Sequence, residues 1–498
     1  MTFADLLTLG LSLVLAGYAF LSVLAVRRTR DPAALAVFGL TAYWTVIGAF
    51  SILQAKREAG GTVYTYMEDR LFLVLVDGDY ATTLLAYSVF MLVLVLGYLM
   101  WSKPARPGRD LSAQWQAVAE RFSHPVLISI VGVAAAARLA LVVFLVRANA
   151  GETSLYAATR TVKGGESGLL RAYQYLNVLG SYSVVCGLGL WLGFATARAR
   201  YRPTTRLALW LGYAVLTAEA LGENALLGNR AVPLLMMGAI AAGWLRWLYV
   251  PAPPHRRRRL ALQFVMAAVL GVFALGMIGA SRGGGLTTPG AVLARLASSV
   301  TLVTEVIDQV AGSSERLASH MSLYGLIHQE ELPLSPWASN SYAAYATQVN
   351  APDDQVFTIH YVAAWWIRLG PLAPLVAGVT FAVVMVALQL LSRGPIGMIR
   401  AGLALPAAVL PAAGLPITLV RSGPESIRAV VIELVLIPGA AAMLCLWVGA
   451  RSAARLADPR PDELPWGAEP DATDPDPRPL IASRPGAPVG AIRTGPPQ

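Results

Sequence analysis

Two glutamates four residues apart, Glu219 and Glu223, lie within an apolar run of the chain at 206–228. The run is long enough to cross a bilayer as a helix, and a spacing of four places both carboxylates on one helical face. An ionisable group in a membrane span is costly and therefore faces a partner or a polar cavity. The pair predicts either a structural ion pair between helices or a polar cavity in which one glutamate acts as a general base.

Arg138 lies near the middle of another apolar run, at 126–148, and follows a series of alanines. Small residues allow helices to pack closely in a membrane, and an arginine at that depth needs a carboxylate or a ligand anion. Glu219, Glu223 and Glu433 lie in candidate spans and could each supply the carboxylate. The alternative is that Arg138 binds substrate.

Three further arginines stand at the ends of apolar runs: Arg230, Arg282 and Arg421. A guanidinium group binds phosphate oxygens through two parallel hydrogen bonds. Three such groups that converge on one face would suit a pyrophosphate. Each arginine alone is equally consistent with a long side chain that reaches the lipid headgroups.

The polar stretch at 281–370 concentrates histidine and aromatic side chains. Its candidates for substrate binding are His320, His328, His360, Tyr324, Trp337 and Tyr342. The spacing of eight between His320 and His328 is not a usual metal-ligand spacing, whereas one of the histidines could be a general base. The remaining histidines are then surface or structural residues.

Two shorter patterns carry weaker predictions. Asp77 and Asp79 form a DxD pattern, which in some glycosyltransferases holds a divalent metal with a donor phosphate, but three residues also occur in this order by chance. Cys186 and Cys445 both lie in candidate spans and are expected to be small core residues. We therefore expect no metal site and no cofactor.

The composition indicates that the elements carrying these residues lie in a membrane. The chain of 498 residues is 56% hydrophobic and only 14% charged, against about 25% charged residues in soluble domains, and its mean hydropathy is +0.57. The net charge of +10 is carried by arginine clusters between apolar runs, which indicates membrane topology rather than nucleic-acid binding.

About eleven apolar runs are long enough to span a bilayer as helices. They are 4–26, 33–54, 80–101, 126–148, 172–197, 206–228, 231–250, 260–280, 371–391, 400–420 and 428–450.

Basic residues gather in alternate loops, which predicts an orientation. The basic segments are Arg27–Arg30, Lys103–Arg121, Arg198–Arg206, Arg246–Arg259, Arg393–Arg400 and Arg451–Arg455. Because cytoplasmic loops carry the excess of lysine and arginine, we expect the N-terminus outside, the C-terminus in the cytoplasm and the 281–370 loop outside.

The expected fold is an all-α, polytopic membrane protein of about eleven transmembrane helices. Residues 1–280 form the N-terminal part of the transmembrane bundle, with about eight spans. Residues 281–370 form one large external loop with short amphipathic helices at about 291–310 and 358–369. Residues 371–450 form the C-terminal spans, and residues 451–498, rich in proline, glycine and aspartate, form a disordered cytoplasmic tail.

This layout resembles the O-antigen and oligosaccharide repeat-unit polymerases of the Wzy type, which share a fold with O-antigen ligases. The resemblance rests on a GNR triplet that ends in Arg230, on an SRG triplet around Arg282, and on the large external loop in the C-terminal half. The segments FTIHYVAAWWIRLGPLAPLVAGV and DGDYATTLLAYSVFMLVLVLGYL are similar to the family's pattern at the end of that loop and in an early span. The motifs are short, and the resemblance covers most of residues 30–450 as architecture.

The resemblance implies a multi-pass glycosyltransferase of the bacterial inner membrane that works at the periplasmic face. A saccharide chain would leave one polyprenyl pyrophosphate and join a repeat unit on another, so the implied partners are polyprenyl-pyrophosphate-linked oligosaccharides, membrane lipids and a chain-length regulator protein, with no nucleic acid. Arg230, Arg282 and Arg421 would hold pyrophosphate or orient the acceptor. Glu219, Glu223 or a loop histidine would accept the acceptor proton, and the loop aromatics would stack on sugar rings.

Three other functions remain open from the sequence. An O-antigen ligase would share the fold. A glycosyltransferase of the GT-C type would use the acidic pair Asp77 and Asp79 in its first external loop. A transporter or flippase for polysaccharide or lipid-linked sugar would carry charged residues along a path through many spans, and Arg138 and Glu433 are the residues that favour this.

Overall fold

The computed structural model describes the chain in segments separated by gaps. These are residues 3–42, 62–67, 70–75, 78–104, 111–148, 168–226, 231–253, 255–266, 323, 326–327, 359–394, 397–421 and 423–457. Residues 1–453 form one compact unit and residues 454–498 a second, of which only the end of the last helix is described.

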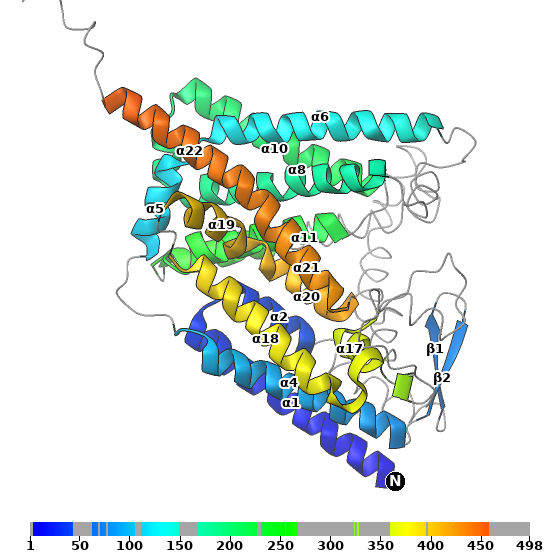
Figure 1. The fold of residues 1–498 in the computed structure, drawn as a ribbon. Coiled ribbons are helices and arrows are strands. Elements are labelled where there is room, and N and C mark those ends of the chain that lie inside the picture. Colours follow the sequence, from blue (N-terminus) through cyan, green and yellow to red (C-terminus); the bar gives the residue numbers. More distant parts are fainter. Residues whose placement is uncertain are drawn as a thin grey trace, which may run out of the picture. The chain divides into compact units, whose positions relative to one another are not determined.

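The described residues are mainly helical (Figure 1). The N-terminal half contains α1 (Phe3–Thr29), α2 (Pro32–Ala42), α4 (Gly78–Trp101), α5 (Leu111–Arg121), α6 (His124–Ala148), α8 (Gly168–Gly193), α9 (Ala195–Ala199), α10 (Pro203–Leu226), α11 (Ala231–Trp244) and the π-helical turn η2 (Leu245–Tyr249). The C-terminal half contains α17 (Tyr361–Leu369), η3 (Gly370–Leu372), α18 (Ala373–Ser392), α19 (Met398–Val409), α20 (Pro411–Arg421), α21 (Glu425–Val431), the π-helical turn η4 (Ile432–Leu436) and α22 (Ile437–Ala457).

One β-hairpin departs from the expected all-α fold. Strands β1 (Thr62–Met67) and β2 (Arg70–Leu75) pair antiparallel, and two residues connect them. Strand β1 is rich in β-branched and aromatic residues, which favour extended backbone, whereas half of β2 is leucine. The sequence analysis predicted no strand here.

Five described helical segments are long and apolar enough to cross a membrane: Asp79–Trp101, His124–Phe144, Ala172–Gly193, Tyr361–Ser392 and Glu425–Ser452. Helices α19 and α20 form a sixth if they count as one span bent by 56°. The bend falls at Pro411, where proline lacks the N–H that would continue the helix. The structure is thus that of a helical membrane protein with five or six spans among the described residues.

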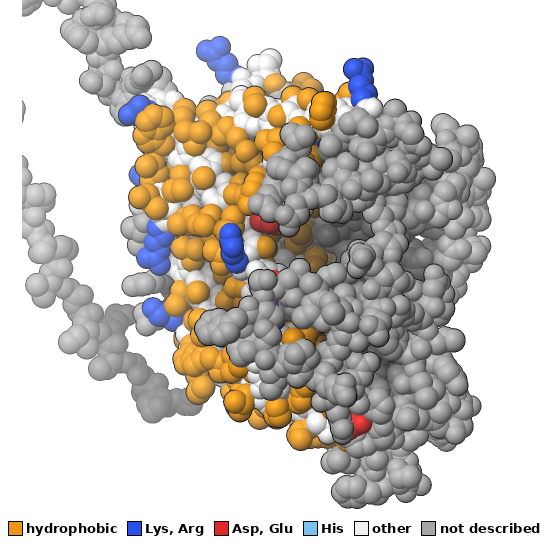
Figure 2. All heavy atoms as spheres, turned by 45° about the vertical axis from the view of Figure 1, so that its right-hand side comes forward, with side chains coloured by type: hydrophobic (Ala, Val, Ile, Leu, Met, Phe, Trp, Pro, Cys, Tyr) orange, Lys and Arg blue, Asp and Glu red, His pale blue; other side chains and the backbone are white. Residues whose placement is uncertain are grey.

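Large apolar side chains on the outer surface agree with this environment. Figure 2 shows hydrophobic side chains over most of the described surface on one face, with basic side chains mainly near its edges. Val133 is 72% exposed on α6, and Leu207 and Val215 are more than 60% exposed on α10. Water would disfavour such a surface, whereas lipid tails would not.

Close helix packing depends on small residues. Helix α18 packs against α4 and α17, and α4 also packs against α1. A Cβ on Gly378 of α18 would lie 3.0 Å from the main-chain oxygen of Phe90 and 2.8 Å from Val93, both on α4. Only glycine therefore permits this approach, in the manner typical of membrane helices.

The α17 helix is more deeply buried than the sequence suggested. We expected a short interfacial helix at 358–369, but Tyr361, Ile367 and Arg368 are buried. Arg368 donates to the carboxylate of Glu425 at 3.1 Å, and α17 continues through η3 into α18 as a single candidate span. The helix belongs to the bundle because its partners α18 and α20 surround it.

Several arginines meet at one end of the bundle, which we call the arginine-capped end and define by Arg200, Arg246 and Arg393. The Arg393 guanidinium donates to the main-chain oxygens of Thr29, at 2.7 Å, and Pro104, at 3.0 Å. Burial lowers the pKa of Arg393 from its ordinary value, although the nearby Asp31 carboxylate opposes this shift. The side chain joins the loops after α1, α4 and α18.

Arg246 and Arg200 extend the same end. Arg246 donates to the main-chain oxygen of Ser392 at 2.9 Å and lies 5.9 Å from the ring centre of Trp115 in α5. Arg200 donates to the main-chain oxygen of Phe122. Segments from five of the six basic loops therefore lie together, as expected if these loops share one side of the membrane.

Candidate functional site: the Arg138 cluster

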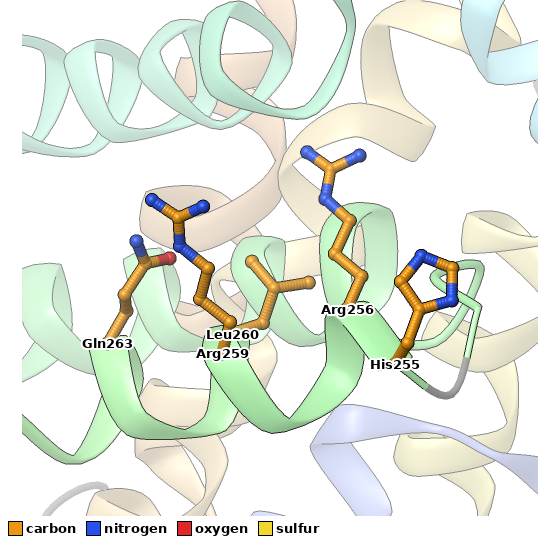
Figure 3. A pocket seen from close by; sticks show the side chains of 5 residues that line it. All are labelled: His255, Arg256, Arg259, Leu260 and Gln263. Carbon is orange, nitrogen blue, oxygen red and sulfur yellow. The ribbon is translucent and has the colours of Figure 1, made fainter.

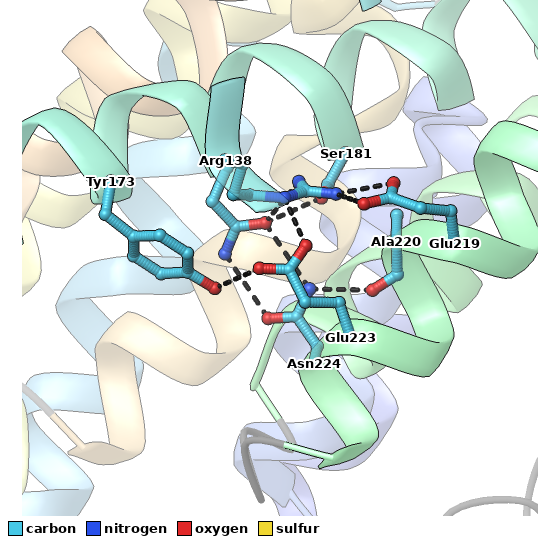
Figure 4. A network of polar contacts seen from close by, with 8 residues as sticks. Arg138, Tyr173, Ser181, Glu219, Ala220, Glu223 and Asn224 are labelled. Atoms are coloured by element: carbon cyan, nitrogen blue, oxygen red, sulfur yellow. Dashed lines mark hydrogen bonds and ion pairs between the residues drawn. The ribbon is translucent and has the colours of Figure 1, made fainter. Parts of the chain in front are cut away.

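A cluster of polar and charged side chains lies inside the bundle, centred on Arg138 of α6 (Figure 4). The Arg138 side chain is 0% exposed. Its Nη2 lies 2.5 Å from each carboxylate oxygen of Glu219, and its Nε forms an ion pair with Glu223 Oε2. One guanidinium group thus holds both glutamates of α10.

Helix α8 supplies the neutral partners of the cluster. Asn177 Oδ1 accepts from Arg138 Nη1 at 2.9 Å, and Ser181 Oγ donates to the same Asn177 oxygen at 2.9 Å. The Tyr173 hydroxyl donates to Glu223 Oε1 at 2.7 Å. Asn177 and Asn224 also bond through their amides at 3.3 Å.

The local sequence explains why these side chains converge. Tyr173, Asn177 and Ser181 are spaced by four and so form one stripe along α8, as Glu219 and Glu223 do along α10. Helix α8 packs against both α6 and α10, so the two stripes meet around Arg138.

Gly180 makes room for the guanidinium group. A Cβ at this position would lie 3.3 Å from Arg138 Nη1, which is tighter than an ordinary van der Waals contact. The sequence analysis missed Gly180 and the polar stripe of α8, although the spacing of that stripe within an apolar run was a readable signal.

The two carboxylates differ in access and in partners. The Glu223 side chain is 6% exposed and has Tyr173 as a second partner, whereas the Glu219 side chain is 19% exposed. With all three groups ionised, the cluster carries one negative charge in excess. Glu219 is therefore the carboxylate that can reach a ligand, and Glu223 is held in place.

These contacts distinguish the two roles predicted for Arg138, an ion pair between helices and a contact with substrate. Glu219 and Glu223 are its partners among the described residues. The third candidate, Glu433, lies in η4 and is not an ion-pair partner of Arg138. Arg138 is an ion-pair residue whose donors are occupied, and a direct contact with substrate would require these bonds to open.

Most of the other candidates lie outside the described residues. This applies to Arg230, Arg282, His320, Tyr324, His328, Trp337, Tyr342 and Asp77. Arg421 is the last residue of α20, and its side chain is likewise outside the description. The structure therefore leaves the predicted arginine site untested.

His360 is described, and its place is structural. It caps the N-terminus of α17, where its Nδ1 accepts from the Val362 amide at 3.2 Å. Its ring packs edge-on against Tyr87, with ring centres 4.9 Å apart, and is 3% exposed. This burial does not favour His360 as a substrate ligand.

The described residues contain no group of three His, Cys, Asp or Glu side chains arranged to hold a metal ion. Cys186 and Cys445 are buried and form no disulfide bond. Asp79 lies in the first turn of α4. An acidic side chain at this position stabilises the helix, because it interacts with the positive end of the helix dipole.

No protein-family model, no curated protein and no solved structure matches this chain.

Proposed function

We propose that this protein is a membrane glycosyltransferase that polymerises polyprenyl-pyrophosphate-linked oligosaccharide repeat units, like the O-antigen polymerases that its sequence resembles. The observation that carries the proposal is the Arg138 cluster. Within a bundle of apolar helices, one partly exposed carboxylate, Glu219, is held by a buried arginine. Such a group suits the removal of a proton from a sugar hydroxyl away from bulk water.

The reaction follows from this arrangement. The hydroxyl oxygen of the acceptor saccharide attacks the anomeric carbon of the donor saccharide, and the bond from that carbon to the pyrophosphate oxygen breaks. Glu219 accepts the hydroxyl proton. The electron pair leaves with the polyprenyl pyrophosphate, so the donor is already activated and no nucleotide is consumed.

The remaining residues have supporting roles in the proposal. Arg138 is a positioning residue, which fixes Glu219 through contacts to both carboxylate oxygens. Glu223, held by Arg138 and Tyr173, orients the guanidinium group. Arg230, Arg282 and Arg421 would stabilise the departing pyrophosphate, because guanidinium groups bind phosphate oxygens in pairs.

The number of membrane spans and the orientation of the chain are part of the same proposal. The chain would cross the inner membrane about eleven times, with its N-terminus and the 281–370 loop in the periplasm and its C-terminus in the cytoplasm. The clustering of segments from the basic loops at the arginine-capped end supports a common side for them. A chain-length regulator would be the protein partner.

Deletion followed by analysis of lipid-linked glycans tests this function. If the protein is a polymerase, single repeat units accumulate on the polyprenyl carrier. Finished chains that stay on the carrier would identify a ligase instead. Units trapped in the cytoplasmic leaflet would identify a flippase, in which intramembrane charges such as those of the Arg138 cluster would line the transport path.

Complementation with variants then tests the site. Glu219→Gln should reduce polymerisation by about 10²- to 10⁴-fold, the usual contribution of a general base, with normal protein level. Glu433→Gln is the matched control, since Glu433 is also a half-buried carboxylate in a candidate span, and it should retain chain length. A fully active Glu219→Gln protein would exclude Glu219 as the base.

A further inference from the structure

A basic surface lies outside the Arg138 cluster, on the helical residues 255–266. Five side chains line a hollow of about 510 Å³ (Figure 3): His255, Arg256, Arg259, Leu260 and Gln263. Four of these positions follow the spacing i, i+3, i+4, i+7 from Arg256, so they form one face of the helix. Figure 3 shows the side chains projecting from the same side of it.

The arginine side chains of this helix differ in the hydrogen bonds that they donate. Arg257 donates to the main-chain oxygens of Ala252, at 2.8 Å, and Val250, at 3.0 Å, and so fixes the start of the helix. The guanidinium groups of Arg256 and Arg259 make no hydrogen bond or ion pair with any other described residue. Their guanidinium groups remain available to a ligand in the hollow.

The positive charge of the hollow favours the binding of an anion. No aspartate or glutamate occurs between Arg246 and Met266, so the two guanidinium groups have no acidic neighbour along this segment. Each presents parallel donors that match the oxygens of a phosphate, and the Gln263 amide adds a further donor.

The surroundings of the hollow indicate where that anion comes from. The same helix continues into large apolar side chains that are more than half exposed, namely Leu262, Val265 and Met266. The hollow therefore lies where a basic turn gives way to a surface suited to lipid tails. A lipid phosphate sits at this boundary, and basic pockets on membrane helices bind such headgroups.

We propose that the hollow lined by Arg256, Arg259 and Gln263 binds the phosphate group of an anionic membrane phospholipid. The two guanidinium groups hold the phosphate oxygens, and the lipid tails lie along the apolar surface beyond Leu260. This site is independent of the proposed glycosyltransferase activity.

Lipid binding to the full-length protein in neutral detergent tests the site. The probes are phosphatidylglycerol, phosphatidylcholine and inorganic phosphate, with bound lipid measured by native mass spectrometry. Wild type should retain phosphatidylglycerol in preference to phosphatidylcholine. The double variant Arg256→Gln/Arg259→Gln should retain it about 30-fold less well, taking about a factor of five for each guanidinium group that contacts the phosphate.

Arg258→Gln is the matched control, because Arg258 is exposed on the same turn but does not line the hollow; it should change binding little. An equal loss in Arg258→Gln, or no loss in the double variant, would overturn the site. Inorganic phosphate that binds as tightly as the lipid would overturn the lipid as ligand. The single variant Arg259→Gln, expected to lose about fivefold, replaces the double variant if that protein unfolds.

Discussion

The Arg138 cluster and the arginine-capped end use the same side chain in opposite ways. At the capped end, Arg393 and Arg246 donate to main-chain oxygens and remain half-buried, and the Asp31 carboxylate lies near both without a direct ion pair among the described residues. In the cluster, Arg138 is fully buried and is in direct contact with two carboxylates. An arginine deep in the bundle is thus held by carboxylates in contact, whereas one at the end is held mainly by main-chain acceptors.

This difference has a functional consequence. At the arginine-capped end, the planar guanidinium group matters because it reaches several main-chain oxygens at once. These contacts add no reactive group. The cluster instead concentrates ionisable groups in a low-dielectric setting, where each charge controls the others. The cluster holds a partly exposed carboxylate, Glu219, whereas the Asp31 carboxylate near the capped end is buried and accepts from Tyr98. The predictions below separate charge balance from geometry in the two regions.

Arg138→Met should have the largest effect, because it leaves two neighbouring carboxylates without their cation. We expect a loss of about 3–5 kcal/mol in the free energy of unfolding, the usual cost of breaking a buried ion pair, measured by denaturant unfolding in detergent. The triple variant Arg138→Met/Glu219→Gln/Glu223→Gln removes the charge imbalance and should recover much of the loss. Equal stability of the single and triple variants would show that charge balance is not the cause.

Arg393→Lys should have the next largest effect, although it preserves the charge. A lysine ammonium cannot reach the oxygens of Thr29 and Pro104 together, so one of these acceptors loses its charged donor. We expect a loss of about 1–3 kcal/mol, with unchanged membrane orientation in a cysteine-labelling assay. Arg400→Lys, at an exposed position of the same basic loop, is the control. A stable Arg393→Lys protein would mean that charge alone matters at the capped end.

Tyr173→Phe tests a single neutral contact of the cluster. It removes the hydroxyl that donates to Glu223 at 2.7 Å, and we expect a loss of about 1 kcal/mol, as for hydrogen bonds between membrane helices. Tyr175→Phe, at a position 50% exposed on the same helix, should be neutral. If both substitutions cost the same, the Tyr173 bond contributes nothing specific.

Gly180→Ala should have the smallest effect. The added methyl group lies 3.3 Å from Arg138 Nη1, so the held guanidinium must shift by a few tenths of an ångström, at a cost below about 1 kcal/mol. In Gly222→Ala on α10 the new Cβ meets no atom within 4 Å, and this protein should be at least as stable as wild type. Denaturant unfolding in detergent compares both, and a Gly180→Ala protein as stable as the control would show that the guanidinium adapts freely.

Particular residues show how far prediction from sequence reached. The helical period predicts that Glu219 and Glu223 share one face, and the cost of an unpaired charge in a membrane predicts that Arg138 pairs with Glu219, Glu223 or Glu433. That Arg138 binds both Glu219 and Glu223 was not predicted. The stripe of Tyr173, Asn177 and Ser181 was missed, since polar neutral residues are tolerated in apolar runs for many reasons. The β1–β2 hairpin was missed as well, because its alternation is short.

By itself, the sequence determined that this is a helical membrane protein, where its candidate spans lie and which loops are basic, because these depend on local hydropathy and charge along the chain. Only the tertiary structure decided that Arg138 meets Glu219 and Glu223 rather than Glu433, and that Arg393 joins three loops. Such contacts depend on how each helix is rotated and how closely small residues let it approach its neighbours, and that information is spread over helices far apart in the sequence.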